Sequence, residues 1–221
     1  MARHLQKEIE NLKKELLTLC AMAEDRLWQA VNSIKNRDIK LAEKIMDSDM
    51  DIDQMEVKVE EECLKILALH QPVAIDLRFI ITALKINNDL ERIGDLAVNI
   101  AERSHFLATQ KTISIRFDFE TMAEKTQTML KNSIDAMINI DLDLALRVCQ
   151  ADDEIDTLNR QMYEQVKIQI KQQPEHIETL IHLLSVSRHL ERIADHATNI
   201  AEDVIYMIKG EIVRHKTENY L

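Results

Sequence analysis

The stretch LERIGDLAVNIAE at residues 90–102 decides the fold, because it returns later in the chain as LERIADHATNIAE at residues 190–202. The two copies differ only where Ala, His and Thr in the second replace Gly, Leu and Val in the first. A repeat of this length indicates two copies of one structural unit. Each copy carries its own acidic pair, Glu91 with Asp95 and Glu191 with Asp195.

The composition around these stretches favours helices throughout. The chain of 221 residues contains only 2 glycines and 2 prolines, and aromatic residues make up 4% of it. Gly and Pro are the residues that interrupt helices, and aromatic residues favour strands. The sequence therefore predicts an all-α protein of two tandem, similar three-helix bundles related by a pseudo-twofold internal repeat.

Apolar spacing and breaks place the six helices. Residues recur at intervals of three and four, and Pro72 and Pro174 end the second helix of each half because the residue before a proline is pushed out of helical geometry. The predicted helices cover about 5–34, 38–69, 74–106, 118–139, 142–171 and 175–208. We expect a first bundle at 1–108, a linker at 109–116, a second bundle at 117–210 and a polar tail at 211–221.

Charge and cysteine content exclude several classes of protein. A net charge of −11 argues against a nucleic-acid partner, since phosphate backbones are bound by clustered Lys and Arg. The 3 cysteines lie far apart, as expected of reduced thiols in a cytoplasmic protein. No apolar run reaches the ~18–20 residues needed to span a bilayer, so membrane contact is expected only through partners or a surface patch.

Carboxylates follow one face of each repeated stretch. At ~100° per residue, Glu91, Asp95, Asn99 and Glu102 share an arc on the side away from the apolar residues. The same arithmetic places Glu191, Asp195, Asn199 and Glu202 together. The second helix of each half adds further acids: Asp49 and Asp53, with Glu56 and Glu60 continuing the row, and then Asp152 and Asp156. Two such rows on neighbouring helices predict a surface groove of about four carboxylates in each half.

Three interpretations of these acidic rows are open. A charged outer helix face is usually solvated surface, and Arg92 and Arg192 can form ordinary pairs with neighbouring acids. The rows can also form a docking face for a basic partner. Alternatively a bound cation offsets the repulsion between like charges four residues apart, and oxygen ligands favour Mg²⁺, Mn²⁺ or iron. His189 and His196 beside the second row widen that choice to Zn²⁺.

Catalysis has little support in the sequence. Ferritin-like enzymes bring two Glu-x-x-His pairs into a bundle core, whereas this chain has the spacing only once, at Glu102 and His105. Two glycines exclude a glycine-rich phosphate loop. A metal-dependent enzyme with clustered carboxylates, such as a phosphohydrolase, is the alternative to a non-enzymatic adaptor.

The chain resembles the PhoU family of phosphate-signalling regulators. The residues that carry the resemblance are QPVAIDLRFIITALKINNDLERIGDLAVNIAER at 71–103, SRHLERIADHATNIAEDVIYMIKGE at 187–211, and the D-x-x-I-D segments 49–53 and 152–156. They span most of the chain in the family's order. The resemblance implies a non-enzymatic regulator that restrains phosphate uptake and couples the Pst transporter to the PhoR–PhoB two-component system.

The resemblance also implies partners and metal ligands. The implied partners are the transporter ATPase and the sensor histidine kinase, and we also expect a homodimer. Family members can carry multinuclear metal clusters through E/D-xxx-D motifs, so iron, Zn, Mn or Mg is the implied cofactor. Carried onto this chain, the ligands are Asp49, Asp53, Glu91 and Asp95 in one half, and Asp152, Asp156, Glu191 and Asp195 in the other. Asn99, Glu102, Asn199 and Glu202 are weaker candidates.

Overall fold

A computed structural model describes residues 2–48, 50–113 and 119–211, which form seven α-helices and one short 3-10 helix and no strand. The predicted all-α class is confirmed. The α-helices are α1 (Ala2–Asn36), α2 (Ile39–Asp47), α3 (Met50–His70), α4 (Ala74–Thr109), α5 (Phe119–Asn139), α6 (Leu142–Gln172) and α7 (Ile177–Lys209), with η1 at Pro174–His176. Within these residues no helix has the length and apolarity to cross a membrane.

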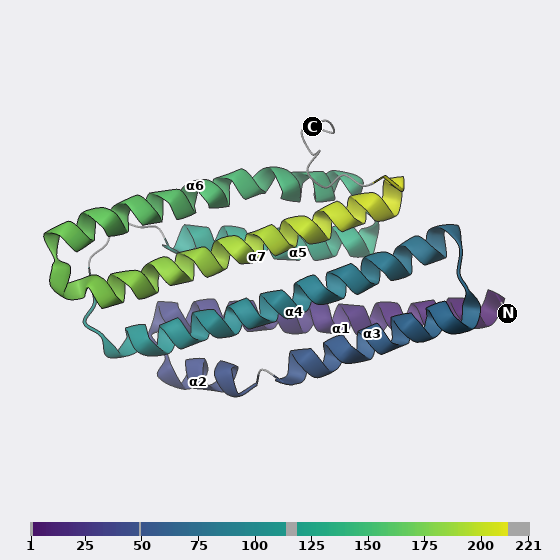
Figure 1. The fold of residues 1–221 in the computed structure, drawn as a ribbon, viewed down its shortest axis with the longest axis horizontal. Coiled ribbons are helices and arrows are strands. Elements are labelled where there is room, and N and C mark those ends of the chain that lie inside the picture. Colours follow the sequence, from purple (N-terminus) through teal and green to yellow (C-terminus); the bar gives the residue numbers. More distant parts are fainter. Residues whose placement is uncertain (1, 49, 114–118, 212–221) are drawn as a thin grey trace.

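The long helices lie roughly along one axis of an elongated molecule (Figure 1). Helices α4 and α7, which carry the two repeated stretches, lie side by side and run in opposite directions. Helices α1, α2 and α3 pack around α4, whereas α5 and α6 pack around α7. The repeat therefore places its two copies next to each other at the centre of the fold.

The core is continuous across both halves. Buried apolar residues occupy equivalent places in the two repeated stretches, as with Leu90 and Leu190 or Ile93 and Ile193, each 0% exposed. They belong to one cluster with buried residues of α1, α5 and α6. The two units thus share a hydrophobic core, which opposes independent motion of the halves. The boundaries that we expected between the units stay a prediction, since part of the linker lies outside the described residues.

Equivalent turns begin the second helical segment of each half. Asp38 accepts a hydrogen bond from the backbone N–H of Leu41 at 3.0 Å, and Asp141 accepts one from Leu144 at 2.9 Å. These side chains satisfy backbone donors that the first turn of a helix leaves without a partner. Gly210 ends α7 in a left-handed conformation with φ +76°, as the sequence predicted.

One predicted helix is broken in the structure. We expected residues 38–69 to form a single helix, but α2 ends at Asp47 and α3 begins at Met50. The backbone N–H of Ser48 turns back to the carbonyl of Ile45, and Arg26 donates to the carbonyl of Ser48. The correction has a local cause, because Ser and Asp side chains compete for backbone hydrogen bonds and favour helix ends over helix interiors.

Candidate functional site

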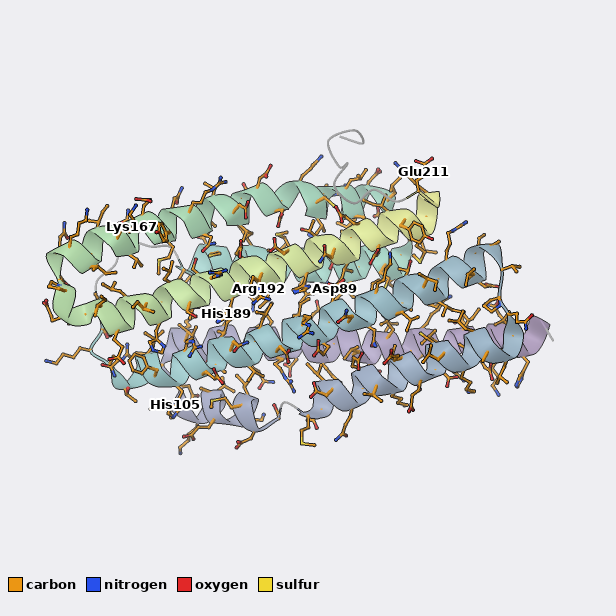
Figure 2. The ribbon with its side chains drawn as sticks, in the orientation of Figure 1. Asp89, His105, Lys167, His189, Arg192 and Glu211 are labelled. Atoms are coloured by element: carbon orange, nitrogen blue, oxygen red, sulfur yellow. The ribbon has the colours of Figure 1, made fainter. Side chains whose placement is uncertain are left out.

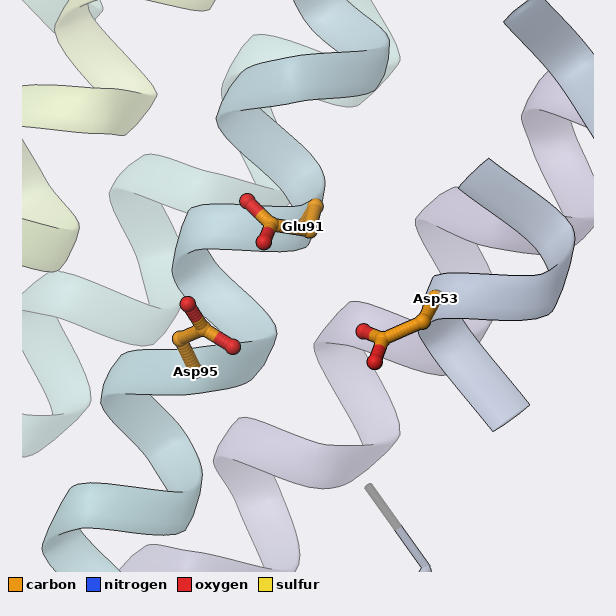
Figure 3. Close-up of side chains that lie close together, drawn as sticks. All are labelled: Asp53, Glu91 and Asp95. Atoms are coloured by element: carbon orange, nitrogen blue, oxygen red, sulfur yellow. The ribbon is translucent and has the colours of Figure 1, made fainter. Parts of the chain in front are cut away.

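Three carboxylates converge between α3 and α4 (Figure 3). Glu91 and Asp95 lie one turn apart on α4, and Asp53 faces them from the first turn of α3. One oxygen from each residue lies within 4.8 Å of the other two. In the part of the chain that the structure describes, no other three His, Cys, Asp or Glu residues approach one another this closely.

A glycine lies at the point where the two helices approach. Gly94 is buried on α4 between Glu91 and Asp95, and it faces Ile52, the neighbour of Asp53. A Cβ atom at position 94 would lie 2.9 Å from Ile52 Cδ1, closer than ordinary van der Waals contact allows. The missing side chain therefore lets α3 pack close to α4 and helps to bring Asp53 toward the other two acids.

The local charge of the three-acid group is strongly negative. Arg92 is the basic residue in contact with it, 3.4 Å from oxygens of both Glu91 and Asp95, and its side chain is 56% exposed. Burial, followed by the charge of Asp95, raises the pKa of Glu91 above its ordinary value, although Arg92 lowers it in part. A bound cation would relieve this repulsion.

The donor set fits a hard metal ion. Oxygen ligands bind Mg²⁺ at ~2.0–2.1 Å and Ca²⁺ at ~2.3–2.6 Å, so ligands of one ion lie within roughly 5 Å of one another. The spacing of at most 4.8 Å meets this requirement. Asp53 is exposed, which leaves one side open for water ligands. Whether the three residues bind a metal stays a prediction.

The corresponding acids of the second half lie near one another without converging in this way. The charge of Asp156 acts on Asp152, Glu191 and Asp195. Burial, then Asp195 and Asp156, raises the pKa of Asp152 to about 6. Burial, then Glu191 and Asp156, raises that of Asp195 to about 6. The described residues include no group of three among them within 4.8 Å.

The weaker candidates have other contacts. Asn99 donates to the backbone carbonyl of Asp95 at 3.0 Å, and Asn199 donates to Asp89 of the other half at 3.4 Å. Glu102 lies 3.8 Å from Arg103, and Glu202 is half-buried and raises the pKa of Cys149. The predicted ligand Asp49 lies outside the described residues.

The histidines and cysteines are not part of the three-acid group. His196 Nδ1 lies 2.8 Å from Asp89, and His189 Nε2 lies 3.2 Å from the hydroxyl of Ser185. Cys20 and Cys63 are buried and Cys149 is half-buried, all three as free thiols. Burial raises the pKa of each thiol to about 12, which keeps it protonated and unreactive at neutral pH.

The sequence analysis missed a polar contact between the halves. Lys85 of α4 donates to Asp203 of α7 at 2.9 Å, and Asp203 is 1% exposed. A buried carboxylate costs free energy unless it is paired, so this contact joins the two halves at one register. The available signal was the position of Asp203 inside the apolar run Ile200, Ala201, Val204 and Ile205. Its partner could not be identified by helical spacing because Lys85 belongs to the other half.

Comparisons with known proteins agree with this architecture. The family model described as "PhoU domain" matches the chain twice, at residues 16–104 and 119–204. A protein of Aquifex aeolicus named as a homolog of the phosphate-specific transport system accessory protein PhoU is 37% identical, over 96% of either chain. A protein of Clostridium acetobutylicum with the same name is 35% identical, over 94% of this chain and 95% of that one.

Two solved structures show the same fold. The crystal structure of PhoU from Pseudomonas aeruginosa matches with a TM-score of 0.90 and 35% identity, over 93% of this chain and 99% of that one. The crystal structure of the phosphate transport system regulatory protein PhoU from Streptococcus pneumoniae matches with a TM-score of 0.88 and 28% identity, over 95% and 99%.

Proposed function

Because this chain belongs to the PhoU family, we propose that it is an accessory protein of a phosphate-specific transport system. The observation that carries the proposal is the double match to the family domain, which covers both helical units. Relatives of nearly equal length are named for this role. In the proposed role the protein restrains phosphate uptake and represses the phosphate-starvation response.

The proposed partners are the ATPase of the Pst phosphate transporter and the sensor histidine kinase PhoR, which acts with PhoB. The protein works in the cytoplasm as a homodimer and meets the membrane only through these partners. The net charge of −11 supports protein partners over nucleic acid. The role is non-enzymatic, in agreement with relatives that are named as accessory or regulatory proteins.

The three-acid group is proposed to hold a divalent or trivalent metal ion, with Asp53, Glu91 and Asp95 as protein ligands and water in the remaining positions. The spacing of the carboxylate oxygens supports this assignment. Such an ion would supply positive charge that offsets the repulsion between α3 and α4. In the second half, Asp152, Asp156, Glu191 and Asp195 are proposed to form a weaker or differently composed site.

Deletion of the gene in the source organism tests the regulatory role. We expect phosphate-starvation genes to become active in phosphate-rich medium, and a plasmid copy of the gene to restore repression. The purified protein should also retain the transporter ATPase or the sensor kinase from a lysate made in rich phosphate. If expression responds to phosphate equally with and without the gene, the proposed role is wrong.

A further inference from the structure

The interface between α4 and α7, here called the seam, has two ends that the repeat makes equivalent. At one of them, charged side chains of the two helices form pairs. At this end Lys85 contacts Asp203 at 2.9 Å, and His196 contacts Asp89 at 2.8 Å. Asn199 adds a donor to the same oxygen of Asp89 at 3.4 Å. Each buried charge here therefore faces an opposite charge or a hydrogen-bond donor from the other half.

At the other end the equivalent positions carry different residues, and the pairs are lost. Ser185 occupies the place of Lys85, His189 that of Asp89, and Arg103 that of Asp203. Arg103 is 3.8 Å from Glu102, its neighbour in sequence, and forms no hydrogen bond within the described residues. Its side chain is 32% exposed. A partly buried guanidinium with so weak a partner has N–H donors left that an anion could accept from.

Two histidines beside Arg103 also have free polar atoms. His189 bonds Ser185 through Nε2, while its Nδ1 is buried without a partner. The Nδ1 atom of His182 is likewise buried and unpartnered, and its ring stacks on Phe106 with centroids 3.8 Å apart. A buried polar atom without a partner costs free energy, so both rings would gain from a ligand that accepts or donates a hydrogen bond.

Two more arginines strengthen the positive field. Arg188 and Arg192 flank His189 on α7, and burial, followed by the charges of Arg103, Arg192 and Arg188, lowers the pKa of His189. Figure 2 shows His189 and Arg192 along the seam on the side of α7 that faces α4, with Asp89 further along it. Burial, then the charge of Asp156, raises the pKa of Glu191, and Arg188 and Arg192 lower it only in part. No ion pair within 4.0 Å joins Glu191 to either arginine in the described chain.

We propose that this end of the seam binds a small tetrahedral oxyanion of the phosphate class. Arg103 supplies the fork of N–H donors that matches two oxygens of such an anion, and Arg188 and Arg192 add charge from the exposed side. Ser185 and His189 supply neutral hydrogen-bonding groups. The site uses residues from both halves. The anion would therefore join α4 to α7 at this end, as the contact between Lys85 and Asp203 does at the opposite end. The proposal does not depend on the regulatory role.

Titration calorimetry with inorganic phosphate tests the site on the full chain. The protein is kept in chelator at constant ionic strength, so that anions carried by a metal at the acidic groups are excluded. We expect about one phosphate per chain. We also expect Arg103→Gln to weaken binding at least tenfold. Arg147→Gln is the matched control, because Arg147 is an exposed arginine in the groove between α5 and α6 and its loss changes the net charge equally. That variant should bind as the natural protein does.

Several results would overturn the proposal. These are no heat of binding with millimolar phosphate, equal weakening by both variants, or equal binding of chloride. Binding that requires metal would assign the anion to the acidic groups instead. Tighter binding of phosphorylethanolamine would indicate a lipid headgroup and exclude the free anion. If Arg103→Gln fails to fold, as judged by circular dichroism, His189→Asn replaces it, with the same expected loss. Phosphate binding can fail while the deletion strain behaves as proposed, so the two ideas are tested separately.

Discussion

The two halves of this protein share a fold but differ in what their polar residues do. In the first half, Asp53, Glu91 and Asp95 bring three oxygens within 4.8 Å of one another, whereas the equivalent Asp156, Glu191 and Asp195 do not. Lys85 and Asp203 form an ion pair at one end of the α4–α7 seam, whereas Arg103 at the other end has only a long contact with Glu102. Apolar positions of the repeat thus determine the shared architecture, while single polar substitutions make the two copies chemically different.

The largest expected effect comes from breaking the paired end of the seam. Lys85→Met leaves Asp203 charged and buried without its lysine, and loss of one partner from a buried ion pair costs ~3–5 kcal/mol. Lys85 is 36% exposed, so water offsets part of the loss, and we expect the free energy of unfolding to fall by about 2 kcal/mol. Urea denaturation of both proteins in phosphate-free buffer measures this difference in the free energy of unfolding.

Arg103→Met is the matched variant at the other end. In the same buffer it removes a charge that has only a weak partner, so we expect a change in stability below about 1 kcal/mol. Equal losses from the two variants would contradict the contrast between a paired and a weakly paired end. The slope of the free energy of unfolding against urea concentration should be equal for the two variants. Equal slopes would show that the variants differ in stability and not in the surface exposed on unfolding.

The next effect separates the two acidic regions by metal affinity. Asp95→Asn removes a charged ligand from the three-acid group, and Asp195→Asn makes the same change in the second half. We expect Asp95→Asn to weaken the tightest Mn²⁺ site at least tenfold, and Asp195→Asn to leave that site unchanged. Titration calorimetry with Mn²⁺ measures both, after chelator has been removed by dialysis. A larger loss from Asp195→Asn would reverse the ranking of the two sites.

A smaller effect depends on pH. The pKa of Asp152 is raised to about 6 in the folded protein, above the ordinary ~3.9 of an unfolded chain. The folded state therefore holds this proton more tightly, and its contribution to stability is present below pH ~4 and is lost as the pH rises through about 6. Asp152→Asn cannot ionise. In chelator its Tm should exceed that of the natural protein by a few degrees at pH 8 and match it at pH 4. An identical difference at both pH values would show that ionisation is not the cause.

The sequence predicted the helices because their signals are local. Apolar spacing and the prolines at 72 and 174 place most helix ends within a few residues of those observed. The break at Ser48 was missed because helical periodicity continues through it, while the hydrogen bond from Arg26 that supports it comes from a different helix. Contacts between distant segments are not encoded in spacing along one helix.

The sequence predicted which residues belong to the candidate site but not how close together they lie. Helical arithmetic placed Glu91 and Asp95 on one face and Asp53 in the acidic row of the neighbouring helix, and the resemblance to the family named all three as ligands. Neither could show that these three converge while their equivalents do not. The contacts of Asp89 with His196 and Asn199 were missed for the same reason, since they join residues of different halves. The direction in which a side chain points across a helix interface depends on which other side chains fill the space between the two helices, and spacing along one helix does not contain this information.

The smallest expected effect tests whether Gly94 accounts for the difference between the acidic regions. Gly94→Ala gains ~1 kcal/mol of helix propensity, but the new Cβ would lie 2.9 Å from Ile52 Cδ1, so α3 must move or Ile52 must change rotamer. The gain in helix propensity and the cost of the new contact with Ile52 oppose each other, so we expect the free energy of unfolding to change by less than about 1 kcal/mol. Mn²⁺ affinity should nevertheless fall several-fold, because Asp53 follows Ile52 away from α4. Ala194→Gly in the second half should not create a tight site, since it adds space without moving Asp156. If Gly94→Ala leaves Mn²⁺ binding unchanged, Ile52 has adapted alone, and the convergence of the three acids is set by the wider packing of α3.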